Sequence, residues 1–441
     1  MKKAWLVVLA WALLGAGFGL WSWLNRPAWS TRDPEVLALV EKARGELHKL
    51  YYREAAEILE QALAKDPNSF AARYFLQRAY SGLGRSREAR EQLELLKQKD
   101  PATLTPRERM LLDLLLLRRS GDREAFVSRL LEYQAQYPRE VELTRLLALS
   151  YQEAGKSDEA ERWGRKTLEL DANDALAYNI LGYIELARGR FAQAEEQFRK
   201  YAFIAPDQAN PHDSLGELFL ITGRFEEAKK ELEAAVQANP RFYPAWRHWS
   251  DLAVLLGDVE LAKSASGELV TALDLKPEER PVVEATALGL LGFFHGQQTL
   301  LLKAAEVIAK PRDEGEFFVV HAASCARGDW AQAESLEGTV EHAVATGTPG
   351  SRSLARLLPL LRTQRFVGQN RWQDALASAK QAEAAFSFVN VGQAESLLTA
   401  QCWKALALAR LGKKAEALEV LDKVRVTNPR FPLLKRVEGL L

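Results

Sequence analysis

Two segments of this sequence, GRFAQAEEQF at 189–198 and GRFEEAKKEL at 223–232, are nearly identical and begin 34 residues apart. The spacing recurs elsewhere in the chain, because Pro67 and Pro101 are also 34 residues apart. Self-similarity at a fixed period of roughly 20–50 residues is the signature of a stacked repeat architecture. One structural unit is therefore expected to recur along the chain, each copy packing on its neighbours.

Aligned at this period, the unit has an aromatic residue followed by Leu-Gly, then Ala-x-x-x-Phe, then Pro. In one copy these positions are Tyr178, Leu181, Gly182, Ala194, Phe198 and Pro206. The pattern resembles the tetratricopeptide repeat. The resemblance implies an all-α chain, a right-handed superhelical solenoid of antiparallel helix pairs.

The marked residues have mechanical roles in such a pair. Gly182 and Ala194 are small where the two helices of a unit cross. Gly189 and Gly223 are expected to end first helices with positive φ, which glycine adopts at little cost. Pro206 is expected to stop the second helix.

The pattern varies in strength along the sequence. Residues 35–270 are expected to form a regular array and residues 271–395 degenerate repeats of the same kind. Residues 396–441 are expected to form a last repeat and a capping helix, in which Phe431, Leu434 and Val437 pack inward while Lys435 and Arg436 face outward.

The first residues differ from the rest, because residues 4–24 contain no charge. A helix of this length, at about 1.5 Å per residue, spans the ~30 Å core of a bilayer. Tryptophans near both ends, Trp5 and Trp29 among them, suit the membrane interfaces. We expect a retained transmembrane signal-anchor helix followed by a linker at 25–34; the alternative is a cleaved signal peptide with its site at Gly15-Ala16-Gly17.

Flanking charges predict the orientation of this anchor. Lys2 and Lys3 precede it, whereas basic and acidic residues are mixed after it, so the N-terminus is expected in the cytoplasm and the repeats in the periplasm. Gly15 and Gly19 form a G-x-x-x-G face, which predicts a homodimer of the anchor.

Composition argues against several classes of function. The 59 basic residues balance the 59 acidic ones, so nucleic acid is not an expected partner. His212, Asp213 and Ser214 are the three residue types of a hydrolase triad. Adjacent helical positions point about 100° apart, so these side chains cannot hydrogen-bond to one another as a triad. No histidine pairing typical of a metal site occurs. We expect no cofactor, and two free thiols at Cys325 and Cys402 in preference to a bridge between them.

The candidate partner-binding groove consists of positions one and five places after the aromatic residue of each unit, which are expected to face away from the helix packing. These positions are Arg145, Asn179, Asp213 and Arg247 in one column, and Tyr183, Glu217 and Asp251 in a second. Such side chains suit a polar or extended peptide better than a lipid tail, whose methylenes would leave their hydrogen-bonding groups unpaired. The alternative is that they are ordinary solvated positions.

Together these features predict a membrane-anchored, non-catalytic scaffold that binds a protein or peptide, resembling anchored repeat proteins of bacterial envelope assembly, secretion or export. One alternative is a secreted or periplasmic binding protein without the anchor. Another is the substrate-holding subunit of an enzyme complex, although no non-repeat block for chemistry is visible in the sequence.

Overall fold

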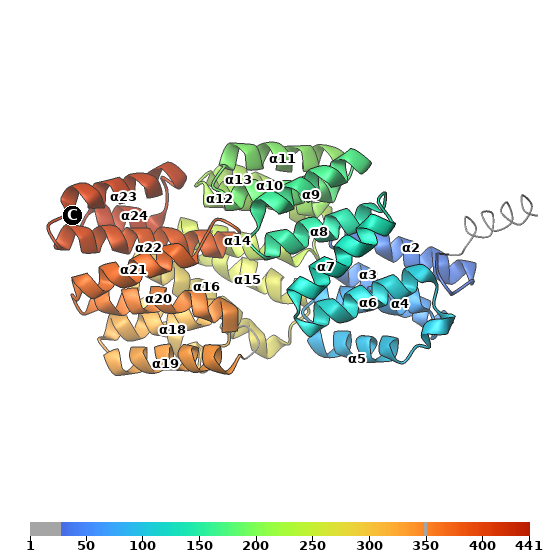
Figure 1. Cartoon of the computed structure of the whole chain (residues 1–441). Helices are drawn as coiled ribbons and strands as arrows, with labels where there is room; N and C mark the ends of the chain where they lie inside the picture. Colours follow the sequence, from blue (N-terminus) through green and yellow to red (C-terminus); the bar gives the residue numbers. More distant parts are fainter. Residues whose placement is uncertain (1–27, 348–350) are drawn as a thin grey trace, which may run out of the picture. The chain divides into compact units, whose positions relative to one another are not determined.

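The computed structural model describes residues 28–347 and 351–441, with no side-chain description at 352. The predicted transmembrane helix at 4–24, including Gly15 and Gly19, lies outside these residues. Throughout the described part, all regular secondary structure is helical, as Figure 1 shows, in agreement with the predicted all-α solenoid. None of the helices it contains is long and apolar enough to cross a membrane.

The chain divides into two compact units, one ending at Leu143 and the other beginning at Thr144. The described part of the first unit contains α2 (Pro34–His48), α3 (Tyr52–Lys65), α4 (Phe70–Gly82), α5 (Ser86–Lys97), the 3-10 helix η1 (Pro101–Thr103), α6 (Pro106–Ser120) and α7 (Arg123–Gln136). Helix α8 (Val141–Glu153) includes the boundary between the units.

The start of the first unit corrects the expectation for Trp29. Trp29 is buried, and its ring meets that of Phe75 edge-to-face at 5.6 Å. The backbone N–H and the hydroxyl of Ser30 both donate to the carboxylate of Glu108, each at 2.9 Å. Trp29 therefore belongs to a protein core and not to a membrane interface. Asp33, within the predicted linker, is exposed and caps α2 through its side chain.

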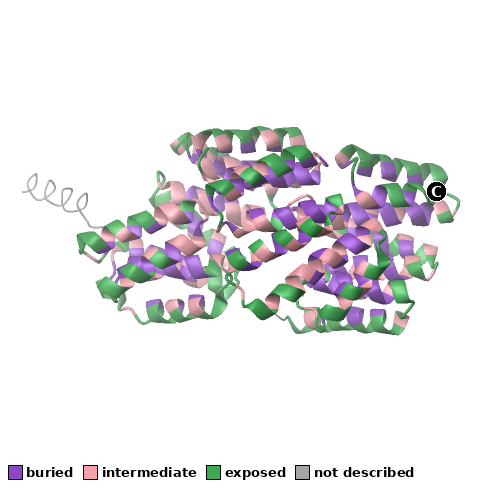
Figure 2. Cartoon of the chain, turned by 180° about the vertical axis from the view of Figure 1, so that it is seen from behind, coloured by how far each residue is buried: buried purple, intermediate pink, exposed green. Residues whose placement is uncertain are grey.

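The second unit has a longer series of helices. They are α9 (Ser157–Leu170), α10 (Ala175–Ala187), α11 (Phe191–Ile204), α12 (Ala209–Ile221), α13 (Phe225–Ala238), α14 (Tyr243–Leu256), α15 (Val259–Leu273), the 3-10 helix η2 (Pro277–Glu279), α16 (Arg280–His295), α17 (Gln298–Val307), α18 (Glu314–Arg327), α19 (Trp330–Thr346), α20 (Ser351–Gly368), α21 (Trp372–Ala385), α22 (Val391–Arg410), α23 (Lys414–Thr427) and α24 (Pro432–Glu438). In Figure 2 helices carry buried residues on one side and exposed residues on the other.

The small residues of the repeat act as expected. A Cβ added to Gly182 would lie 2.3 Å from a ring carbon of Phe198, so α10 and α11 approach too closely there for any side chain. Gly189 and Gly223 have φ of 71° and 72°, which confirms the predicted left-handed turns. Glycine thus sets both the spacing within a helix pair and the turn that joins its helices.

The C-terminal helices of the second unit return to its earlier repeats. The N–H of Val391, which begins α22, donates to Oε1 of Glu217 on α12 at 3.1 Å. The Asn428 side chain after α23 donates to the carbonyl of Leu220 at 3.2 Å. Repeats about 200 residues apart in sequence therefore contact each other, which a solenoid of nearest-neighbour contacts does not require.

Helix α24 lies at the place where the sequence predicts a capping helix. Phe431, Leu434 and Val437 are buried while Lys435 and Arg436 are exposed. The ring of Phe431 packs on Phe294 of α16, with centroids 5.5 Å apart. The end of the array is closed by apolar packing.

Candidate partner-binding site

The first predicted column lies on helices α8, α10, α12 and α14. Arg145 pairs with Asp174 at 3.3 Å, and Oδ1 of Asn179 accepts a hydrogen bond from Ser214 at 3.1 Å. Asp213 is 2% exposed, and its Oδ1 lies 2.7 Å from Nδ1 of His248. The first three members of this column, Arg145, Asn179 and Asp213, therefore each contact another side chain of the same unit.

The second column is equally engaged at two of its positions. The hydroxyl of Tyr183 donates to Oε2 of Glu217 at 2.7 Å, and its ring meets Phe198 edge-to-face at 5.0 Å. Glu217 is 3% exposed and also accepts the N–H of Val391. Tyr183 therefore supports the helix packing, contrary to the expectation that it faces away from it.

A buried histidine holds these carboxylates together. Nε2 of His248 is 3.4 Å from Glu217, in addition to its contact with Asp213. Burial disfavours a charged imidazole, but the negative charges of Asp213 and Glu217 outweigh it and raise the pKa of His248 well above the ordinary value. Burial also disfavours the charged form of Glu217, yet His248, together with hydrogen bonds from Tyr183 and Val391, lowers the pKa of Glu217.

The prediction of an open groove is therefore wrong at Asp213 and Glu217. The physical reason is that both carboxylates contact the buried His248, and that the N–H of Val391, at the start of the returning α22, donates to Glu217. Sequence reasoning missed His248, which stands next to Arg247 and supplies the positive charge that these carboxylates need. The sequence does contain a sign of this cation, because Asp213 and Glu217 lie one helical turn apart on an inner helix. Two acidic side chains buried at such positions require a positively charged partner.

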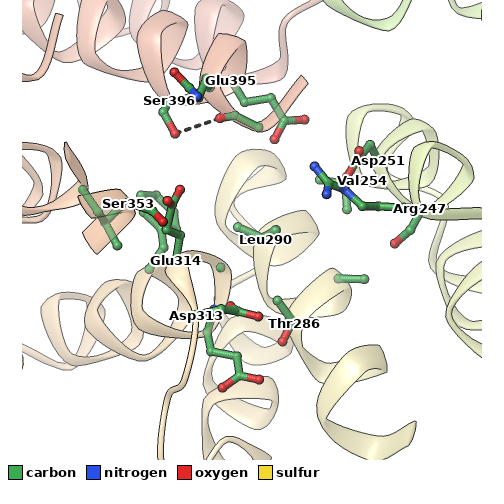
Figure 3. A pocket seen from close by; sticks show the side chains of 18 of the residues that line it. Arg247, Asp251, Val254, Thr286, Leu290, Asp313, Glu314, Ser353, Glu395 and Ser396 are labelled. Atoms are coloured by element: carbon green, nitrogen blue, oxygen red, sulfur yellow. Dashed lines mark hydrogen bonds between the residues drawn. The ribbon is translucent and has the colours of Figure 1, made fainter. Parts of the chain in front are cut away.

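The remaining predicted residues, Arg247 and Asp251, line a cavity of about 700 Å³. Its walls come from the inner helices of successive pairs, α14, α16, α18, α20 and α22, with α15 contributing at one side. Figure 3 shows Arg247 and Asp251 on one wall and Glu395 on another. This volume lies within the range of about 300–1,000 Å³ that is typical of ligand sites.

The lining combines apolar and charged surfaces. Val254, Leu290 and Leu357 contribute apolar side chains from three different helices. Glu395 and Thr399 come from α22, outside the units whose alignment gave the two predicted columns. Because one helix pair contributes few lining residues, the cavity could not be predicted from the repeat; it depends on how five pairs curve around one another.

The three adjacent side chains at 212–214 do not form a triad with one another. The three side chains at 212–214 have separate partners: Nδ1 of His212 lies 2.7 Å from Glu231, whereas Asp213 and Ser214 contact His248 and Asn179. In the part of the chain that the structure covers, no group of three or more His, Cys, Asp or Glu side chains could hold a metal ion. Both cysteines are free. Burial, with a smaller effect of the Glu337 charge, raises the pKa of Cys325 to about 12, so this thiol is not activated.

Comparison with known sequences identifies the repeat. Models described as tetratricopeptide repeat match residues 52–107, 145–209, 211–242 and 360–430. No curated protein matches the sequence significantly.

Solved structures with similar folds are distant in sequence. The crystal structure of PilW, described as a widely conserved type IV pilus biogenesis factor, is 17% identical over 47% of this chain and 94% of its own, with a TM-score of 0.40. A tetratricopeptide repeat protein from Parabacteroides merdae ATCC 43184 is 15% identical over 62% of this chain and 91% of its own, with a TM-score of 0.36. YrrB, described as a TPR protein with an unusual peptide-binding site, is 16% identical over 40% of this chain and 91% of its own, with a TM-score of 0.31. These similarities are too low to transfer a binding site.

Proposed function

Since the chain belongs to the tetratricopeptide repeat family, we propose that it is a non-catalytic scaffold that binds a protein or peptide partner. The observation that carries this proposal is the cavity of about 700 Å³ enclosed by the inner helices of the second unit. Its lining offers apolar side chains for contact area and charged groups for orientation, the combination found in recognition sites. Arg247 and Asp251 are the predicted groove residues that remain open to a partner.

The test places a photo-reactive amino acid at Gln393, which lines the cavity, in the full-length protein expressed in its native host. The matched control places it at Leu418, which is exposed on the outer helix α23. We expect a partner to be captured from Gln393 and not from Leu418, and capture to weaken in Arg247→Ala. Equal capture from both positions would assign binding to the outer helices and refute the cavity.

We further propose that residues 4–24 anchor this scaffold in a membrane, with the N-terminus cytoplasmic and the repeats periplasmic, and that its role lies in envelope assembly, secretion or export. The uncharged stretch and its flanking lysines support this. Mass spectrometry of the membrane fraction should recover the intact N-terminal peptide. A mature chain that begins near Phe18 in the soluble fraction would show a cleaved signal peptide instead.

Self-association of the anchor through Gly15 and Gly19 is part of the same proposal. Close approach of two helices at a G-x-x-x-G face requires both glycines. Leucine at both positions should therefore abolish association of the isolated segment in a membrane reporter assay. An unchanged signal would remove the homodimer from the proposal.

A further inference from the structure

One end of the cavity carries an excess of carboxyl groups. Among its described lining residues, five are acidic and three are basic. Two of the basic residues are already paired, Arg312 with Glu316 at 2.8 Å and Arg356 with Glu314 at 3.8 Å. Apart from these pairs, the end of the cavity formed by α14 and α22 has one guanidinium, that of Arg247.

The charge of Arg247 is shared among several carboxylates. Asp251 acts on it most strongly, followed by Glu217, and Asp213 contributes as well. Glu395 faces the same guanidinium from α22, as Figure 3 shows. His248 already serves Asp213 and Glu217. Four acidic groups therefore lie near two basic groups at this end of the cavity.

Two oxygen atoms at this end also lack hydrogen-bond partners. Oε1 of Glu395 and Oγ1 of Thr399 are both shielded from solvent, and neither has a hydrogen bond among the described residues. Thr399 is 1% exposed, and both residues belong to the cavity lining. A buried oxygen without a hydrogen-bond donor is destabilising, so such a pair of atoms marks a place where a ligand can supply N–H groups.

We propose that this end of the cavity receives a positively charged side chain, lysine or arginine, of the bound peptide. The inference rests on the proposed peptide-binding function and specifies what that site recognises. The ammonium or guanidinium group adds positive charge beside Asp251 and Glu395 and supplies hydrogen-bond donors to Glu395 and Thr399. The apolar stem of the same side chain lies against Val254 and Leu290.

A neighbouring feature fits the backbone of such a peptide. Nε of Arg356 is buried without a hydrogen-bond partner, although its guanidinium charge is balanced by Glu314. A peptide carbonyl supplies the acceptor that this N–H lacks. An acidic side chain fits less well, because it would add a further carboxylate to the excess around Arg247.

The carboxyl of Glu395 holds its proton more strongly than an ordinary glutamate, and a bound cation would favour its ionised form. Burial, and then the charge of Asp251, raise the pKa of Glu395 well above the ordinary value, while Arg247 opposes the shift. The charged groups that line the cavity with Glu395 are Asp251 and Arg247 on α14, Arg312 and Asp313 just before α18, Glu314 and Glu316 at its start, and Arg356 on α20. An arriving ammonium favours the ionised carboxylate and stabilises the bound state by a charge-assisted hydrogen bond.

The experiment uses the full-length protein in detergent micelles and two kinds of probe. The first is a library of acetylated, amidated heptapeptides, randomised except for a central lysine, arginine, norleucine or glutamate. The second is n-hexylammonium, with hexanoate as its anionic counterpart, detected by saturation-transfer NMR. Proteins compared are the parent, Glu395→Gln and the control Glu419→Gln, which removes an exposed carboxylate from the outer helix α23. Thermal unfolding of each variant checks that the fold is retained.

We expect the lysine and arginine libraries to bind at least about tenfold more tightly than the norleucine library. Glu395→Gln should remove this preference while leaving norleucine binding in place, and Glu419→Gln should keep it. Library binding without a basic preference, or with a preference for glutamate, would overturn the inference and leave the peptide-binding function standing.

The small probes separate the two proposals. If no library binds but n-hexylammonium does, and Glu395→Gln abolishes its signal, the cation site holds and the peptide-binding function fails. If neither probe binds, both are rejected.

Discussion

Replacing His248 by leucine should destabilise the centre of the second unit by about 3–5 kcal/mol, because it leaves buried carboxylates without their counter-charge. His248 is 6% exposed, and Asp213 and Glu217, its partners at 2.7 and 3.4 Å, are 2% and 3% exposed. Water therefore does not replace the lost interaction. An exposed ion pair would contribute no more than about 1 kcal/mol.

Native-state hydrogen exchange suits this test, since a chain with two compact units need not unfold in one step. Amides of α12, α14 and the start of α22 should exchange about 10²–10³ times faster in the variant, at roughly tenfold per 1.4 kcal/mol. His342→Leu removes an exposed imidazole on α19 and serves as the control. Acceleration of less than about tenfold, or equal acceleration in both variants, would refute the argument.

The same histidine predicts a pH dependence. Its folded pKa is raised above the unfolded value near 6.5, so the stabilisation is fully present below that pH and is lost as pH rises through the raised folded value. The difference in melting temperature between the parent and His248→Leu should be largest at pH 6 and should narrow in alkaline buffer. A difference that grows with pH would show that His248 is buried in its neutral form.

Three further substitutions test the packing around the site. Gly182→Ala should cost about 1–3 kcal/mol, since its Cβ would lie 2.3 Å from a ring carbon, whereas Gly338→Ala on α19, with open space around it, should not lower the melting temperature. Tyr183→Phe should cost about 1–3 kcal/mol, since it removes the hydroxyl that donates to the charged carboxylate of Glu217 at 2.7 Å, and chemical denaturation would show no loss if that bond is unimportant. Thr399→Val should be neutral or stabilising by up to about 1 kcal/mol, since its hydroxyl is buried without a partner; a clear fall in melting temperature would mean that the hydroxyl is satisfied.

The helix pairs could be predicted from sequence because each is a local unit with its own glycine, alanine and proline positions. Gly182 and Gly223 determine contacts and turns within one or two neighbouring repeats, and the structure has them as the period indicates. The contact between Val391 and Glu217 could not be predicted in this way, because it depends on the accumulated curvature of several pairs, and no single repeat encodes it.

The candidate site could also be predicted only in part from the sequence. Arg247 and Asp251 were found by their register, because inner-helix positions repeat every 34 residues. Asp213 and Glu217 share that register, yet both are buried; His248 contacts both, and Val391 of α22 contacts Glu217. Glu395 and Thr399 belong to α22, outside the units whose alignment gave the groove columns. Register predicts which helix face a residue occupies, and distant contacts decide whether that face stays open.

Helix α22 and the segment after α23 both contact α12. These contacts affect the order in which the second unit can fold during synthesis. Val391 bonds to a residue 174 positions earlier, and Asn428 to one 208 positions earlier. During synthesis, Glu217 and the Leu220 carbonyl therefore receive these two hydrogen bonds only after most of the chain has been made. An ordinary repeat array can be shortened from its end one unit at a time. Shortening this one before Val391 would also remove both of these donors from a distant part of the same unit.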